Sequence, residues 1–357
     1  MDTDRRHMLA ALHMARRGLG RVWPNPSVGC VIIKDGRMVG TARTANGGRP
    51  HAETLALQQA GQEAKGAVVY VTLEPCAHEG ATPPCVDALI RAEVKRVVIG
   101  TVDPDPRTAG KGIKKLQEAG IETALGILEE ECWQINQGFF LRITEHRPLI
   151  ALKAACTQSG QLSPREGRWI SGREALNHVH LERSKYDAIL IGIGTALADD
   201  PMLTVRLPGL SHQPVRVVLD SGLRLRLESR LVKSAKTVPL WVIYAEADGI
   251  REKALQEQEV KLFKTTRHSL KEVVKRLAEE GITRLLVEGG PTIHGAFMKE
   301  GLCDQMSVYR SQEMSEGRGE ALFAPPALES YRKKQGLALL KTRRIEQDLL
   351  EIYSRKV

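Results

Sequence analysis

One histidine, one glutamate and two cysteines have the types and spacing that best fit chemistry in this chain. His51 and Glu53 are separated by a single residue, and eight residues separate Cys76 from Cys85. One imidazole and two thiolates are good ligands for Zn²⁺, and a three-ligand site leaves the fourth position open for water, as in catalytic zinc sites. The set therefore predicts a zinc site that performs hydrolysis.

The glutamate fits the proton transfers that this hydrolysis needs. Zinc lowers the pKa of its bound water so that hydroxide is available near neutral pH, and a neighbouring carboxylate can carry protons. Glu53 is close enough to His51 in the sequence to reach this water without being a ligand. Attack on an amino-bearing ring carbon would release ammonia. We therefore predict an amidine deaminase with Glu53 as the catalytic residue and His51, Cys76 and Cys85 as metal ligands.

Local patterns place these residues at the ends of regular elements. His51 opens a helix expected over 52–60, Cys76 follows a strand expected over 67–73, and Cys85 starts a helix expected over 85–92. We expect both cysteines at helix N-termini, where the dipole and free amides favour thiolate over thiol.

A structural zinc site is the alternative interpretation of the same residues. Such a site needs a fourth ligand, and His78 in the loop between the cysteines is the only local candidate. This alternative leaves Glu53 unexplained, so hydrolysis is the favoured hypothesis.

The rest of the chain has the pattern of an α/β protein with two domains. The polar segment 145–148 precedes a strand-like run at 149–153, and we place the boundary there, giving domains 1–145 and 146–357. Further helices are expected at 4–17, 112–119 and 129–140, and further strands at 28–33, 38–40, 96–102, 121–125, 188–193, 215–220, 238–245 and 284–288.

Composition limits the partners and the location. The formal net charge is +9, but aromatic residues make up only 4%, so the mixed aromatic and basic pattern of a single-strand nucleic-acid binder is missing. No run approaches the roughly eighteen apolar residues of a membrane span. We expect a cytoplasmic protein without a nucleic-acid or membrane partner. The other cysteines follow no disulfide framework and are expected as packed core residues; they are Cys30, Cys132, Cys156 and Cys303.

The motifs around the predicted metal ligands resemble known deaminases. The His-x-Glu and Pro-Cys patterns are similar to those of zinc nucleobase deaminases, although those have two residues between the cysteines. The longer spacing, together with the runs 24–32, 51–53 and 72–85, resembles the bifunctional deaminase/reductase family of riboflavin biosynthesis. The resemblance spans nearly the whole chain. It implies a cytidine-deaminase-like three-layer α/β/α domain followed by a dihydrofolate-reductase-like α/β domain, with Zn²⁺ and NADPH as cofactors.

For the first reaction, the resemblance implies hydrolytic removal of the 2-amino group from a phosphorylated pyrimidine, 2,5-diamino-6-(5-phosphoribosylamino)pyrimidin-4-one. Asn25 and His78 would line the base pocket, and Lys111 would meet the substrate phosphate. We also expect a homo-oligomer.

For the second reaction, the resemblance implies NADPH-dependent reduction of the ribosyl group to ribityl. The residues expected at NADPH are Ala155, Trp169, Thr195, Asp199, Ser221, Gly290, Pro291, Thr292, Ile293, His294, Gly295 and Ala296. Those expected at the substrate are Lys153, Gly167, Arg183, Leu203, Arg206 and Glu288. A guanidinium offers fixed, paired donors, which suits Arg183 and Arg206 to phosphate.

Departures from the family pattern keep two alternatives open. Ser159 stands where the family usually has an aspartate, Gly167 replaces a serine, and 309–313 differs from an apolar strand that leads to a turn. One alternative is a deaminase with a degenerate C-terminal domain, which NADPH oxidation would test. The other is an RNA-binding or RNA-editing deaminase, which salt-sensitive RNA binding would reveal.

Overall fold

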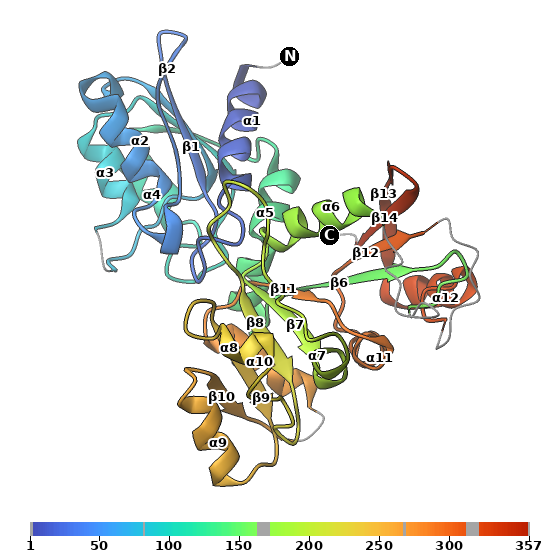
Figure 1. The fold of residues 1–357 in the computed structure, drawn as a ribbon. Helices are drawn as coiled ribbons and strands as arrows, with labels where there is room; N and C mark the ends of the chain where they lie inside the picture. The colour runs from blue at the N-terminus through green and yellow to red at the C-terminus, as the bar shows by residue number, and fades with distance from the viewer. Residues whose placement is uncertain (1–2, 81–82, 163–171, 267–268, 312–320, 356–357) are drawn as a thin grey trace. The chain divides into compact units, whose positions relative to one another are not determined.

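The computed structural model describes residues 3–80, 83–162, 172–266, 269–311 and 321–355. The chain divides into two compact units, Met1–Arg147 and Pro148–Val357 (Figure 1). Within the described ranges, no helix is both long enough and apolar enough to cross a membrane.

Five strands of the described residues form the sheet of the first unit, in the order β2-β1-β3-β4-β5. Strand β1 is antiparallel to β2 and β3, whereas β3, β4 and β5 run parallel. The strands are β1 (Gly29–Lys34), β2 (Arg37–Arg43), β3 (Val68–Leu73), β4 (Arg96–Thr101) and β5 (Glu122–Leu125). The helices are α1 (Thr3–Arg16), α2 (Ala52–Ala60), α3 (Cys85–Arg91), α4 (Lys111–Glu118) and α5 (Glu129–Thr144), with short 3₁₀ turns η1 (Asn46–Gly48) and η2 (Gly61–Ala64).

Alternation along the strands gives this sheet two apolar faces. Cys30 and Ile32 pack with buried residues of α2, α3 and α4, whereas Val31 and Ile33 pack with those of α1 and α5. Successive strand side chains point to opposite faces, so both faces must be covered by helices. The expected three-layer α/β/α architecture is confirmed.

Helix α1 approaches the sheet closely at one glycine. A Cβ atom built on Gly29 would lie 1.9 Å from the carbonyl oxygen of Ala11, which is backbone and cannot move aside. Any larger residue there would push α1 away from β1.

The expected packing role of the four remaining cysteines is confirmed as well, because Cys30, Cys132, Cys156 and Cys303 are all free and buried.

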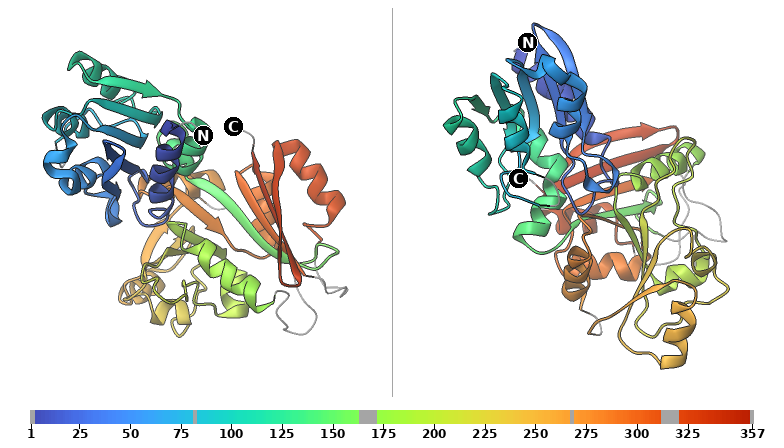
Figure 2. Two further views of the ribbon diagram at one scale, coloured as in Figure 1. Left: turned by 90° about the horizontal axis from the view of Figure 1, so that it is seen from above. Right: turned by 90° about the vertical axis from the view of Figure 1, so that its left-hand side faces the viewer.

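Nine described strands form the sheet of the second unit, in the order β10-β9-β8-β7-β11-β6-β12-β14-β13. The strands from β10 to β12 run parallel, and the β13–β14 hairpin adds two antiparallel strands at one end (Figure 2). They are β6 (Leu149–Cys156), β7 (Ala188–Gly192), β8 (Val215–Leu219), β9 (Leu240–Tyr244), β10 (Lys261–Lys264), β11 (Arg284–Val287), β12 (Gln305–Arg310), β13 (Leu337–Ile345) and β14 (Asp348–Arg355). The helices are α6 (Arg173–Arg183), α7 (Ile193–Asp199), α8 (Arg230–Lys233), α9 (Gly249–Gln256), α10 (Leu270–Glu279), α11 (Pro291–Lys299) and α12 (Pro325–Gln335).

Strand β12 contains the first two residues of the segment 309–313 that the sequence analysis singles out. It pairs with β6 on one side and β14 on the other, and it runs as far as Arg310. The Arg310 Nε lies 3.0 Å from Glu351 on β14, and its Nη1 donates to the Cys156 sulfur at 3.6 Å. The arginine side chain is 10% exposed and the glutamate 17%. A charged pair therefore lies largely buried between β12 and β14.

Removing one member of this pair is predicted to destabilise the second unit. Glu351→Ala leaves the Arg310 charge largely buried without its carboxylate, which we expect to cost about 3 kcal/mol of unfolding free energy. Guanidinium chloride unfolding followed by circular dichroism measures the change. The double variant Arg310→Ile, Glu351→Leu should recover most of the stability, because an apolar pair needs no counter-ion. Equal losses in both variants would contradict this account.

Candidate functional site

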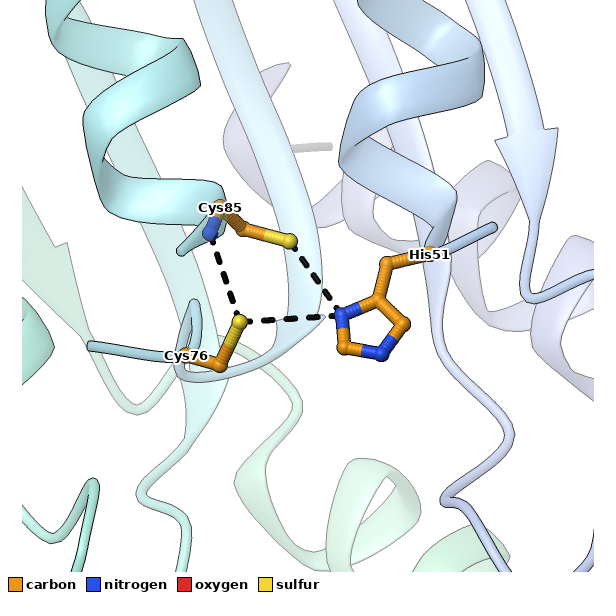
Figure 3. A group of neighbouring side chains, drawn as sticks. All are labelled: His51, Cys76 and Cys85. Atoms are coloured by element: carbon orange, nitrogen blue, oxygen red, sulfur yellow. Dashed lines mark hydrogen bonds between the residues drawn. The ribbon is translucent and has the colours of Figure 1, made fainter. Parts of the chain in front are cut away.

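The structure brings the three predicted metal ligands together. The Nδ1 atom of His51 lies 3.3 Å from the Cys85 sulfur and 3.6 Å from the Cys76 sulfur, and all three donor atoms lie within 4.8 Å of one another. Figure 3 shows the imidazole pointing at both sulfurs through this nitrogen. His51 caps α2, Cys76 follows β3, and Cys85 is the first residue of α3.

These spacings fit a zinc ion. Zn–S bonds of about 2.3 Å and Zn–N bonds of about 2.0–2.1 Å in a tetrahedron put nitrogen and sulfur ligands roughly 3.5 Å apart. The two nitrogen–sulfur distances observed here fall on either side of that value. Among the described residues three donors meet here, which leaves one coordination position for water or substrate, as in catalytic zinc sites.

The cysteines differ in how they meet a helix N-terminus. The expectation that both lie at such an end is wrong for Cys76, which lies in the segment after β3. Its sulfur nevertheless accepts the backbone N–H of Cys85 at 3.3 Å, at the first turn of α3. Hydrogen bonding from Cys85 and His51 lowers the pKa of Cys76 to about 4. The neighbouring Cys76 sulfur and burial raise the pKa of Cys85.

Glu53 lies beside the three donors without belonging to them. It occupies the first turn of α2, it is buried, and its carboxyl group interacts with the Cys85 thiol. Burial raises the pKa of Glu53 to about 6, although His51 opposes the rise. A carboxyl group with a pKa near neutrality can both accept and return a proton, which is what a general acid–base catalyst requires.

Asn25 and His78 each contact a segment that flanks the donors. The Asn25 amide donates to the Gly48 carbonyl at 3.0 Å, three residues before His51. The His78 Nδ1 lies 3.2 Å from the hydroxyl of Thr108, which is fully buried. Lys111, expected at the phosphate, donates to the Pro106 carbonyl at 2.8 Å. Whether these side chains contact substrate stays a prediction.

A cavity of about 1160 Å³ lies within the second unit, at the carboxyl ends of its parallel strands. Ligands of open α/β sheets bind in such crevices. The predicted cofactor residues that line it are Ala155, Thr195, Asp199, Ser221, Gly290, Pro291, Thr292, Ile293, His294 and Ala296. The predicted substrate residues that line it are Lys153, Arg183, Leu203, Arg206 and Glu288.

Four predicted residues need separate comment. Trp169 and Gly167 lie outside the described residues. Gly295 is not among the cavity-lining residues. The ring of His294 is buried in the core. Its centroid lies 5.6 Å from that of Phe323, and its Nε2 lies 3.4 Å from a backbone carbonyl. Only part of His294 can therefore face a ligand.

An ion cluster stands on the cavity wall. Glu288 receives two hydrogen bonds from the Arg183 guanidinium, at 2.7 and 2.9 Å, and lies 3.8 Å from the Lys153 ammonium. Burial alone would raise the pKa of Glu288, but the two cations outweigh it and lower the pKa to about 2. Burial also lowers the pKa of Lys153. Glu288 is thus an ionised carboxylate that pairs with the two cations Arg183 and Lys153 at the cavity.

Sequence reasoning missed several polar residues on the same wall. His180, Arg224, Thr266 and Ser269 also line the cavity. Periodicity gives no signal for them, because they lie in loops or at element ends and meet the others only through the fold.

Family models match both units of the chain. A model described as "Cytidine and deoxycytidylate deaminase zinc-binding region" matches residues 1–101, and one described as "RibD C-terminal domain" matches residues 148–349. The riboflavin biosynthesis protein RibD of Aquifex aeolicus is 42% identical over 322 residues, covering 88% of this chain and 89% of that protein. The Escherichia coli protein of the same name is 38% identical, covering 91% and 92%.

The chain belongs to the RibD family. Its fold matches that of the Acinetobacter baumannii RibD with a TM-score of 0.86 at 35% identity, covering 99% of both chains. A deaminase/reductase from Thermotoga maritima gives a TM-score of 0.84 at 31% identity, also covering 99% of both. As a RibD-family enzyme of riboflavin biosynthesis, the chain combines a deaminase and a reductase and uses Zn²⁺ and NADPH. The expected fold class, a cytidine-deaminase-like domain followed by a reductase domain, is confirmed.

Replacing a sulfur donor of this RibD-family chain is predicted to release the metal. Cys85→Ala removes one of three protein donors, so the purified variant should lose most of its zinc, from about one ion per chain. Inductively coupled plasma mass spectrometry measures the content. Cys132→Ala, which replaces another buried cysteine of the same unit, is the matched control and should keep its zinc. Full zinc occupancy in Cys85→Ala would contradict the assigned donor set.

The ion cluster predicts an acid-dependent stability. A carboxylate whose folded pKa is lowered stabilises the fold above its unfolded pKa of about 4.3, and this stability is lost as the pH falls toward 2. We expect the second unit to lose up to about 3 kcal/mol over this range through Glu288. Denaturant unfolding at several pH values should show a weaker pH dependence in Glu288→Gln. Glu279→Gln, at an exposed position of α10, should behave like the parent. An unchanged slope in Glu288→Gln would contradict the assignment.

Proposed function

We propose that the chain catalyses two consecutive steps on one phosphorylated pyrimidine. The first converts 2,5-diamino-6-(5-phosphoribosylamino)pyrimidin-4-one to the corresponding uracil, with water consumed and ammonia released. The second reduces the ribosyl side chain to ribityl with NADPH. Residues 1–145 would perform the deamination and residues 146–357 the reduction. The observation that carries the proposal is the convergence of His51, Cys76 and Cys85 beside the buried carboxyl group of Glu53.

In the deaminase, His51, Cys76 and Cys85 would hold zinc, which when bound supplies Lewis-acid activation of water. Glu53 would take a proton from the water as its oxygen bonds to the amino-bearing ring carbon, and would deliver the two water protons in turn to the ring nitrogen and to the amino group, after which the C–N bond breaks and ammonia leaves. The buried carboxyl group of Glu53 in the first turn of α2, beside the Cys85 thiol, suits both transfers. Asn25 and His78 would orient the ring, because both belong to segments that flank the donors.

In the reductase, NADPH when bound supplies the hydride. The expected NADPH contacts include Trp169 and Gly295, and the expected substrate contacts include Gly167. Lys153 would stand beside the reacting sugar, with its ammonium group 3.8 Å from Glu288. Arg206 would be available to the phosphate, whereas the Arg183 guanidinium is already shared with Glu288.

The intact cluster favours an active reductase over a degenerate one. Lys153, Arg183 and Glu288 come from three separate elements, and a domain without a ligand has no need to hold these charges at a cavity. The family's usual aspartate is replaced by Ser159, whose hydroxyl lies 2.8 Å from that of Thr157. The turn at this position therefore keeps a local side-chain hydrogen bond.

We further propose a cytoplasmic homo-oligomer without a nucleic-acid partner. Strand β13 supports the oligomer, because it is a sheet edge and carries the exposed side chains Leu339 and Leu340. An exposed sheet edge is a natural site for pairing with another chain.

Product analysis with and without NADPH tests the proposal. The purified protein with the diaminopyrimidinone phosphate should release ammonia, and added NADPH should then be oxidised in step with it. Glu53→Gln should keep its zinc, because Glu53 is not a ligand, but lose ammonia release by about 10²–10⁴-fold. The same variant should still oxidise NADPH when given the deaminated intermediate.

Three outcomes would contradict parts of this scheme. Ammonia release without NADPH consumption would make the second unit a noncatalytic partner. Unchanged turnover in Glu53→Gln would remove this residue from the mechanism. Absence of ammonia with the parent enzyme would overturn the deaminase assignment.

A further inference from the structure

Glu74 is a buried carboxylate that the proposed mechanism does not use. It directly follows β3, where its backbone N–H donates to the carbonyl of Thr101 at the end of the parallel strand β4. Its side chain is buried, and only Pro75 separates it from Cys76. A carboxyl group in this position must find partners for its oxygens, because a buried charge without hydrogen bonds is costly.

The partners of Glu74 are four backbone amides of one loop. Its Oε2 accepts the N–H groups of Asp103 at 3.3 Å and Gly110 at 2.9 Å, and its Oε1 accepts those of Gly112 at 2.9 Å and Ile113 at 3.2 Å. The amides of Asp103 and Gly110 lie near the two ends of the segment between β4 and α4, and those of Gly112 and Ile113 lie in the first turn of α4. One side chain thus holds both ends of loop 103–113.

The glutamate also replaces a missing helix cap. The N-cap residue of α4 is Gly110, with φ of +79° and no side chain to accept the free amides of the first turn. Those amides need an acceptor, and a negative charge near them is favourable. Glu74 provides both from a neighbouring strand end.

The loop held in this way reaches the deaminase site at two points. Thr108, near its middle, contacts His78, the residue proposed for the base pocket. At its end, a Cβ atom on Gly112 would lie 2.3 Å from the Pro75 carbonyl, next to the proposed metal ligand Cys76. The position of the loop therefore depends on Glu74 and on the close approach at Gly112.

We propose that Glu74 is a positioning residue for deamination. By fixing loop 103–113 against the strand end that carries Cys76, it holds Thr108 and through it His78 in place for the pyrimidine. It does not touch the reacting atoms. This inference rests on the proposed deaminase function, so its signature is a change in substrate binding rather than in metal binding or chemistry.

The test compares Glu74→Gln with the parent enzyme in the deaminase assay. The neutral amide keeps one acceptor oxygen and turns an NH₂ group toward backbone donors, so about two of the four hydrogen bonds are lost and the other two lose their charge. We expect the KM for the diaminopyrimidinone phosphate to rise at least about tenfold, with kcat changed much less and zinc content unchanged. Reduction of the deaminated intermediate, measured on the same preparation, should keep the parent rate.

Two further variants make the result specific. Glu118→Gln alters a glutamate on the exposed end of the same helix and should leave both KM and kcat at parent values. Gly112→Ala pushes the loop away from the Pro75 carbonyl and should raise KM as Glu74→Gln does. Combining the two should add little, because both release the same loop.

The possible results separate cleanly. A rise in KM with zinc retained supports the proposal. Loss of zinc in proportion to activity would make Glu74 part of the support for the metal site alone, and unchanged kinetics would remove its role altogether; either result overturns the proposal. A parent enzyme that releases no ammonia refutes the proposed function instead. If Glu74→Gln does not fold, Gly112→Ala decides by the same criteria.

Discussion

The proposed chemistry of the first unit depends on one imidazole nitrogen meeting two sulfurs at the ends of separate elements. The three donor atoms lie within 4.8 Å of one another although their residues are far apart in the sequence. They come from the start of α2, the segment after β3 and the start of α3. Each element is held to the sheet by its own apolar face, so the metal site inherits its precision from the core. Glu53 shares the first turn of α2 with His51 and therefore moves with it.

The second unit also places its site just beyond the ends of its strands, but for different chemistry. Its cavity lies where parallel strands end, and its charged wall joins residues from β6, α6 and the segment after β11. In both units the strands provide a rigid base, while the residues that do chemistry stand just beyond them. This placement lets one chain carry a hydrolytic site and a redox site on two independent cores.

The sequence patterns predicted the strands and helices that have a clear apolar periodicity. Apolar runs such as 188–193 and 215–220 correspond to β7 and β8, and the residues that form the metal site could be named from their spacing. Strand β13 escaped prediction because most of its residues are exposed and it carries little apolar signal. The cap that Glu74 gives to α4 was equally hidden, since donor and acceptor are 36 or more residues apart and neither has a sequence signature of capping.

The contact between Arg310 and Glu351 bears on how this sequence can have diverged from its relatives. A sheet stays stable with a buried charged pair or with a buried apolar pair at these two positions. A single buried charge without its partner destabilises the sheet. A lineage that changes one of these positions first must tolerate a weakened domain until the second follows. The packing of β12 against β14 therefore couples any change at Arg310 to a change at Glu351.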